Sequence, residues 1–93
     1  MGKFKDRLNS IETLIEDSVI LNRKLSDLRN DPSIKNAKAV TTFSSLTSFK
    51  ISSLQNIIQR DLRCGNITTS EYETLIDGLD SVKGVFAVLG LEM

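Results

Sequence analysis

Seven cationic or hydroxyl-bearing residues in the middle of the chain have side chains suited to binding a ligand. Lysine and arginine supply positive charge and N–H donors, and hydroxyls add further donors, which together match the oxygens of a phosphate. Symmetry in an oligomer can gather such groups from several chains. An exposed, hydroxyl-rich helix face explains the same residues without a ligand. The candidate set for a small anionic, phosphorylated or nucleotide ligand is Lys35, Lys38, Thr41, Thr42, Lys50, Arg60 and Arg63.

Residues for catalysis or metal binding are few. The chain has no histidine, the side chain best suited to acid and base work at neutral pH. Asp77 and Asp80 lie three residues apart and form a candidate carboxylate pair, although a solvated acidic face is the favoured interpretation. Cys64 is the only cysteine, so neither an internal disulfide nor a zinc ligand set is expected. We therefore expect no enzyme activity, no cofactor and no metal.

Charge is unevenly distributed along a chain that is neutral overall. Residues 1–29 carry +1 (six basic, five acidic), residues 30–65 carry +3 (five basic, two acidic) and residues 66–93 carry −4 (one basic, five acidic). The balance is neutral and no basic stripe stands out, so nucleic acid is not an expected partner. The simplest interpretation is that the basic middle packs beside the acidic last segment.

Hydropathy gives no sign of a membrane segment. No run approaches the roughly 20 apolar residues that a membrane-spanning helix needs. The N-terminus, with Lys3, Lys5 and Arg7, is not followed by the apolar stretch of a signal peptide. The sequence therefore predicts a soluble, cytoplasmic protein with no membrane partner.

Residues 3–29 contain neither glycine nor proline and repeat their apolar positions every seven residues. Such a repeat is typical of a helix in a coiled coil or helical bundle. Val19 and Ile20 fall outside the repeat, which suggests a second contact surface on this helix. The two seam positions hold Phe4, Ile11, Ser18 and Leu25, and Arg7, Leu14, Leu21 and Leu28.

A second helix is predicted over residues 32–64. Asp31 is the expected N-cap, with Pro32 at the first helical position and Gly65 as the stop. A connection this short makes the first two helices antiparallel neighbours. The predicted buried stripe, interrupted by Lys50, is Val40, Phe43, Leu46, Leu54, Ile57, Ile58 and Leu62.

Residues 41–53 are the ambiguous part of this helix. Eight of these thirteen residues are serine or threonine, and both lower helix propensity. Apolar and polar residues also alternate here, as in a strand. A helix is favoured because the segment has no glycine or asparagine turn to make a hairpin. A kinked helix and a strand remain the alternatives.

The last third of the chain has the clearest helix start. Thr68 and Glu71 stand in the spacing of a capping box, and Ile67 and Tyr72 occupy the positions of a hydrophobic staple. A helix is predicted over residues 69–89. Gly78 and Gly84 weaken it, which indicates close packing against a neighbour or a local bend. Its predicted buried stripe is Tyr72, Leu75, Ile76, Leu79, Val82, Phe86 and Leu89.

The sequence as a whole predicts a single all-α domain. We expect a three-helix antiparallel bundle, or a helical hairpin plus a C-terminal helix, completed by oligomerisation. The expected function is that of a small, non-enzymatic interaction protein, such as an adaptor, assembly factor or inhibitor of another protein, acting as a homo-oligomer. The alternative is an oligomeric binding protein for the small anionic ligand. The candidate oligomer interface is Val19, Ile20, Val85, Phe86, Val88, Leu89 and Leu91.

Overall fold

The computed structural model describes residues 2–91 and contains three helices: α1 (Phe4–Asn30), α2 (Ile34–Arg63) and α3 (Thr69–Val88). Within these residues there is no strand, so the all-α prediction is confirmed. Residues 41–53 lie inside the uninterrupted helix α2, and the strand alternative is wrong. Tertiary packing along α2 outweighs the weak helix propensity of its serines and threonines.

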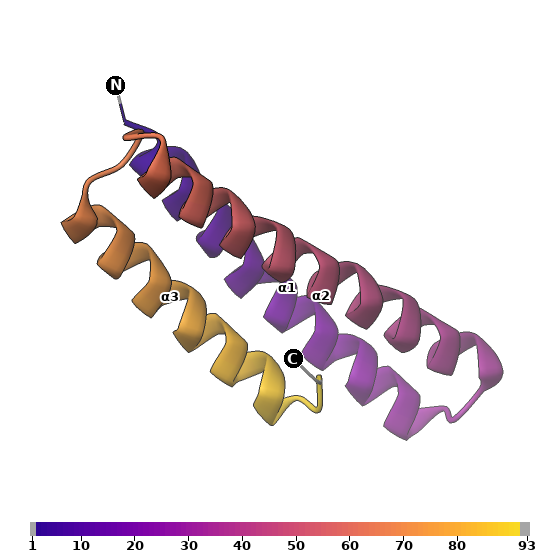
Figure 1. Ribbon diagram of the computed structural model, residues 1–93. Helices are drawn as coiled ribbons and strands as arrows, with labels where there is room; N and C mark the ends of the chain where they lie inside the picture. The colour runs from indigo at the N-terminus through magenta and orange to yellow at the C-terminus, as the bar shows by residue number, and fades with distance from the viewer. Residues whose placement is uncertain (1, 92–93) are drawn as a thin grey trace.

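The helices run up, down and up, so that α1 and α2 are antiparallel and α3 returns beside both (Figure 1). The start of α1 meets the start of α3, where the Lys3 N–H donates to the Asn66 carbonyl at 3.2 Å. Because α3 has 20 residues and α2 has 30, α3 ends before it reaches the α1–α2 turn. The far end of the α1–α2 hairpin therefore projects beyond α3 (Figure 1).

Ser33, and not Asp31, caps the start of α2. Its backbone is extended and its hydroxyl accepts from the Asn36 N–H at 3.1 Å. Asp31 instead ends α1, where its N–H donates to the Asp27 carbonyl at 2.8 Å. Pro32 thus lies between the helices, outside α2. The prediction was wrong because asparagine at position 36 gives the serine cap a stable turn, its side-chain amide donating to the Asp31 carbonyl at 2.9 Å.

The start of α3 has the predicted local structure. The Thr68 hydroxyl accepts from the Glu71 N–H at 3.1 Å, and the Glu71 carboxylate accepts from the Thr68 N–H at 2.9 Å, which confirms the capping box. Gly65 has a φ of 77°, a conformation that glycine adopts without the steric cost of a side chain. Ile67 is buried beside it. The α2–α3 connection is thus fixed at both ends.

The core follows a seven-residue repeat on both α1 and α2. On α2 the repeat places Thr47 and Ile51 in the core and leaves Leu46 on the surface, 56% exposed. The prediction that Leu46 is buried was wrong. The buried positions of α2 keep a spacing of three and four residues, and this spacing places the polar residue Thr47, one residue later, in the core. The buried apolar residues are Ile11, Leu14, Leu21, Ile51, Leu54, Ile58, Ile67, Leu75, Leu79, Val82 and Phe86.

The two glycines inside α3 have different surroundings. A Cβ atom at Gly78 would lie 3.6 Å from Ile11 Cδ1, an ordinary van der Waals contact. A Cβ atom at Gly84 would meet nothing within 4 Å. Gly78 thus packs beside α1 with room for a methyl group, so the close packing predicted from the sequence does not require glycine there, and within the described residues no neighbour contact accounts for Gly84.

Replacing Gly84 with alanine is expected to raise the free energy of unfolding by about 0.5–1 kcal/mol, because alanine favours the helix interior and the new methyl group clashes with nothing. Urea denaturation followed by circular dichroism measures the change. Gly90→Ala is the contrasting control, since Gly90 has a φ of 95° and a side chain there costs about 1 kcal/mol or more. A loss of stability in Gly84→Ala would contradict the open surroundings of that residue.

Candidate functional site

Arg7 of α1 and Asp61 of α2 form a buried ion pair at the end of the bundle that holds the α2–α3 connection. Arg7 Nε donates to Asp61 Oδ2 at 2.6 Å, and Asn66 Nδ2 donates to Asp61 Oδ1 at 3.3 Å. Asp61 is only 2% exposed. The hydrogen bond from Arg7 holds the pKa of Asp61 below its ordinary value, although burial opposes the shift. The pair links α1, α2 and the connection to α3.

Two further contacts give the register of the α1–α2 hairpin. Lys50 Nζ lies 3.2 Å from Asp17 Oδ2, and Lys24 Nζ lies 5.6 Å from the centroid of the Phe43 ring. From the first contact to the second, the residue number rises by seven on α1 and falls by seven on α2, as antiparallel helices require. Asp17 is buried, and its carboxylate is paired with Lys50. This ion pair explains why a lysine interrupts the apolar stripe of α2.

The remaining candidates for catalysis are exposed and separate. Asp77 and Asp80 lie on the solvent-facing side of α3, and Cys64 is an exposed free cysteine at the end of α2. Within residues 2–91, no three histidine, cysteine, aspartate or glutamate residues come close enough to hold a metal ion.

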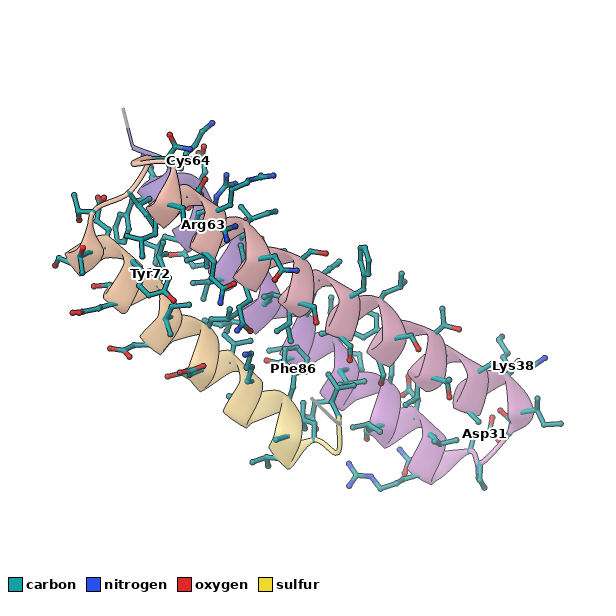
Figure 2. All side chains as sticks on the ribbon, viewed as in Figure 1. Asp31, Lys38, Arg63, Cys64, Tyr72 and Phe86 are labelled. Atoms are coloured by element: carbon teal, nitrogen blue, oxygen red, sulfur yellow. The ribbon has the colours of Figure 1, made fainter. Side chains whose placement is uncertain are left out.

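The candidate anion-binding residues are spread along the whole of α2. Figure 2 shows Lys38 and Arg63 at opposite ends of this helix, a separation of roughly 35–40 Å at 1.5 Å per residue. Lys50 is paired with Asp17, and the Thr41 hydroxyl donates to the Ala37 carbonyl at 3.0 Å. One chain therefore does not assemble the predicted set around a single ligand.

Part of that set does meet at the projecting end of the hairpin. A shallow hollow of about 350 Å³ is lined by Lys24, Lys35, Lys38, Ala39, Thr42 and Phe43. Sequence reasoning missed Lys24, because only the antiparallel register brings this residue of α1 beside α2. Arg60 and Arg63 lie at the other end of the molecule.

Large apolar side chains are exposed on several parts of the surface. The face that each one occupies follows from its spacing to a residue whose contact with a neighbouring helix is known. Ile11 faces α3 at Gly78, whereas Asp17 faces α2 at Lys50. Helix residues three, four or seven apart share a face. The exposed large apolar residues are Ile15, Val19, Ile20, Ile34, Leu46, Phe49, Val85 and Val88.

One apolar surface, named here the α1–α3 patch, consists of Ile15, Val19, Val85 and Val88. Ile15 and Val19 follow Ile11 by four and eight residues, so they lie on the side of α1 that faces α3. Val85 follows Gly78 by seven residues and lies on the side of α3 that faces α1. Counted from the contact of Ile11 with Gly78, Val19 lies eight residues and Val85 seven residues further along these parallel helices, so the two are nearly level on adjoining flanks of α1 and α3.

A second apolar surface, named here the α1–α2 groove, lies on the face away from α3. The hollow has a volume of about 320 Å³, and Phe49, 72% exposed, stands at its edge. Leu46 and Ile20 extend the apolar surface beyond the hollow, because Leu46 lies three residues from Phe49 and Ile20 lies seven residues from Thr13, each on the same helix face. The lining residues are Arg7, Ser10, Thr13, Leu14, Phe49, Lys50, Ser53, Leu54 and Ile57.

The residues predicted for the oligomer interface do not share one surface. Phe86 must be removed from the set, since it is fully buried in the chain's own core and points between α3 and α1 (Figure 2). Leu89 and Leu91 are partly buried and pack against the same core. Val19 belongs to the α1–α3 patch, whereas Ile20, one residue later and about 100° around the helix, borders the α1–α2 groove.

Neither a protein family nor a curated protein nor a solved structure matches this chain. None of the helices in residues 2–91 has the length and apolar character that crossing a membrane requires.

Proposed function

We propose that this chain is a small, non-enzymatic interaction protein that associates with a second copy of itself through the α1–α3 patch. The observation that carries the proposal is large apolar surface left outside a complete core. Apolar patches of this kind on soluble proteins often mark protein–protein contacts. Adaptors, assembly factors and inhibitors of other proteins belong to this functional class.

The core does not need the exposed residues. Leu75, Leu79 and Phe86 of α3 already fill the space between α1 and α2 and are almost completely buried. Among residues 2–91 no buried side-chain nitrogen or oxygen lacks a hydrogen-bond partner. Ile15, Val19, Val85 and Val88 are thus surplus to the fold of one chain, and burying them against another chain would be favourable by roughly 25 cal/mol per Å².

Charge placement on α1 favours a second copy of the chain as the occupant of the α1–α3 patch. Glu12 and Glu16 precede Val19, and Arg23 follows it; all three are exposed. A two-fold axis that passes near Val19 perpendicular to α1 makes the two α1 helices antiparallel. In this arrangement Glu12 and Glu16 of each chain lie near Arg23 of the partner subunit. Such pairing of opposite charges is the self-complementarity that an isologous dimer requires.

The dimensions of the bundle allow such a dimer. The chain extends 48 Å along its axis and 19 Å across. A side of this size can supply the roughly 800 Å² per partner that a standard protein interface buries. The patch lies near the middle of the long axis, where a two-fold contact uses both halves of the molecule.

Sedimentation equilibrium at micromolar concentration tests the proposal. We expect the wild-type chain to have twice its mass of 10.3 kDa, because the apolar patch is buried between copies. The double variant Val19→Asp, Val85→Asp places four carboxylates in the dimer contact and is expected to sediment as a monomer. Circular dichroism establishes that the variant remains helical.

Phe49→Asp is the matched control, since it adds the same charge to an exposed apolar position in the α1–α2 groove. This variant is expected to remain a dimer. A wild-type chain that sediments at 10.3 kDa refutes self-association, and dissociation by Phe49→Asp alone shows that the wrong face was assigned.

A further inference from the structure

Helix α2 carries a second helical stripe that its own bundle does not use. Leu46, Phe49, Ser53 and Ile57 are spaced by three, four and four residues, so they share one face. The core stripe of α2 occupies a different face, with Ile51 buried. The second stripe therefore resembles the contact face of a helix that has another helix packed against it.

Helix α1 supplies the opposite wall of the α1–α2 groove. Ser10 and Thr13 line the hollow. Ile20 is exposed and lies seven residues after Thr13, so it continues this face of α1 toward the projecting end of the hairpin. Leu14 and Leu54 are buried beneath and form an apolar floor. A side chain that enters the groove thus contacts apolar atoms below and hydroxyl groups at the α1 edge.

The length of the apolar track favours a helix over a small molecule. From Leu46 to Ile57 the track spans about 16 Å at 1.5 Å per residue, or three turns of helix. Recognition of amphipathic helices commonly uses such a groove, with apolar anchors at every third or fourth residue. A fourth helix in this position would convert the three-helix bundle into a four-helix bundle.

The charge of α2 specifies the occupant further. All charged side chains that α2 exposes within residues 34–63 are positive, because its one acidic residue, Asp61, is buried. Lys50 stands at the groove with its side chain 53% exposed, so it retains N–H donors besides the one directed at Asp17. The exposed cations of α2 are Lys35, Lys38, Lys50, Arg60 and Arg63.

We infer that the α1–α2 groove binds an amphipathic helix of another protein, with apolar residues facing Phe49 and carboxylates on the flank that faces α2. Carboxylate placement follows from electrostatic complementarity with Lys50 and Arg60. The inference rests on the proposed role as an interaction protein. It concerns a different face from the α1–α3 patch, so either can fail without the other.

A second copy of the chain fits this groove less well. The solvent-facing side of α3 carries the acidic residues Glu73, Asp77 and Asp80. Within Thr69–Val88 a single exposed large apolar residue, Val88 at the end of the helix, accompanies them on that side, so this side has no stripe of apolar anchors. Docking the α1–α3 patch of one copy into the groove of another is a head-to-tail contact, which extends into a filament unless it closes into a ring.

Fluorescence anisotropy with two synthetic peptides tests the inference. Both are helical, about 14 residues long, and share one leucine and phenylalanine stripe. One has glutamates on the flanks and the other has lysines at the same positions. The glutamate peptide is expected to bind the wild-type chain at least about tenfold more tightly than the lysine peptide, a difference of roughly 1.4 kcal/mol. Added salt should reduce this preference.

Two matched variants locate the binding site. Phe49→Ser removes the exposed anchor and is expected to weaken binding of the glutamate peptide at least about tenfold, again roughly 1.4 kcal/mol. Ile34→Ser removes an equally exposed apolar side chain from the start of α2, outside the groove, and is expected to change nothing. Both positions are on the surface, so circular dichroism should show unchanged helicity.

Several results would overturn the inference. These are no saturable binding of the glutamate peptide, equal binding of both peptides, and equal effects of Phe49→Ser and Ile34→Ser. Dissociation of the chain's own oligomer by Phe49→Ser would assign the groove to a second copy. Sedimentation with vesicles of equimolar phosphatidylcholine and phosphatidylserine, if Phe49→Ser abolished it, would assign the groove to a membrane surface.

Discussion

Replacing Phe86 with alanine is expected to lower the free energy of unfolding by about 3–5 kcal/mol. Phe86 has no exposed surface and is among the largest fully buried side chains. Its removal leaves a cavity between α3 and α1 and withdraws apolar area from the packing that holds α3. Because a small domain has only about 5–15 kcal/mol of stability, the loss should be plain in urea denaturation.

Two variants serve as controls. Ile34→Ala removes an apolar side chain that is 76% exposed and belongs to neither apolar surface, and it is expected to change the free energy of unfolding by less than about 0.5 kcal/mol. Phe86→Leu keeps most of the buried volume and should cost about 1.5 kcal/mol, so it remains measurable if Phe86→Ala does not fold. Equal stability of Phe86→Ala and the wild type would show that Phe86 is not a core residue.

Replacing Arg7 with alanine is expected to cost about 2–3 kcal/mol, because Asp61 would remain buried without its cation. The double variant Arg7→Met, Asp61→Leu removes both charges and substitutes apolar groups of similar size. It should recover much of the loss, since replacing both partners of a buried pair is often neutral or stabilising. Urea denaturation of the wild type and these variants measures both effects.

The pH dependence of stability provides a second measurement of the Arg7–Asp61 pair. The pKa of Asp61 is lowered from the ordinary value of 3.8 in the folded chain, chiefly by the hydrogen bond from Arg7. The unfolded chain therefore binds the proton more readily, so the stabilisation by this group is present above pH 3.8 and is lost as pH falls through the lower folded pKa. In Asp61→Asn, this part of the acid dependence should disappear. Identical acid profiles for Asp61→Asn and the wild type would contradict it.

Features that depend on neighbouring residues could be predicted from the sequence. The capping box of Thr68 and Glu71 and the stop at Gly65 involve a few consecutive residues, so their geometry follows from local chemistry. The seven-residue repeat of α1 likewise identified Ile11, Leu14 and Ser18 as inward-facing. Local competition explains the failure at Asp31, because Ser33 offers an equally good cap two residues later.

Features that join residues far apart in the sequence could not be predicted from the sequence. Arg7 and Asp61 are 54 residues apart, and nothing in either segment specifies the other. Periodicity shows that a helix has an apolar side but not which neighbour covers it, so Phe86 was assigned to an interface although α1 and α2 enclose it.

The same limit applies to the candidate site. The sequence alone determined three helices, their direction reversals and a surplus of apolar residues. Only the tertiary structure decided that Val19 joins Val85 on the α1–α3 patch while Ile20 borders the α1–α2 groove with Leu46 and Phe49. The physical reason is that adjacent residues point about 100° apart on a helix, so the packing of three helices determines which residues share a surface.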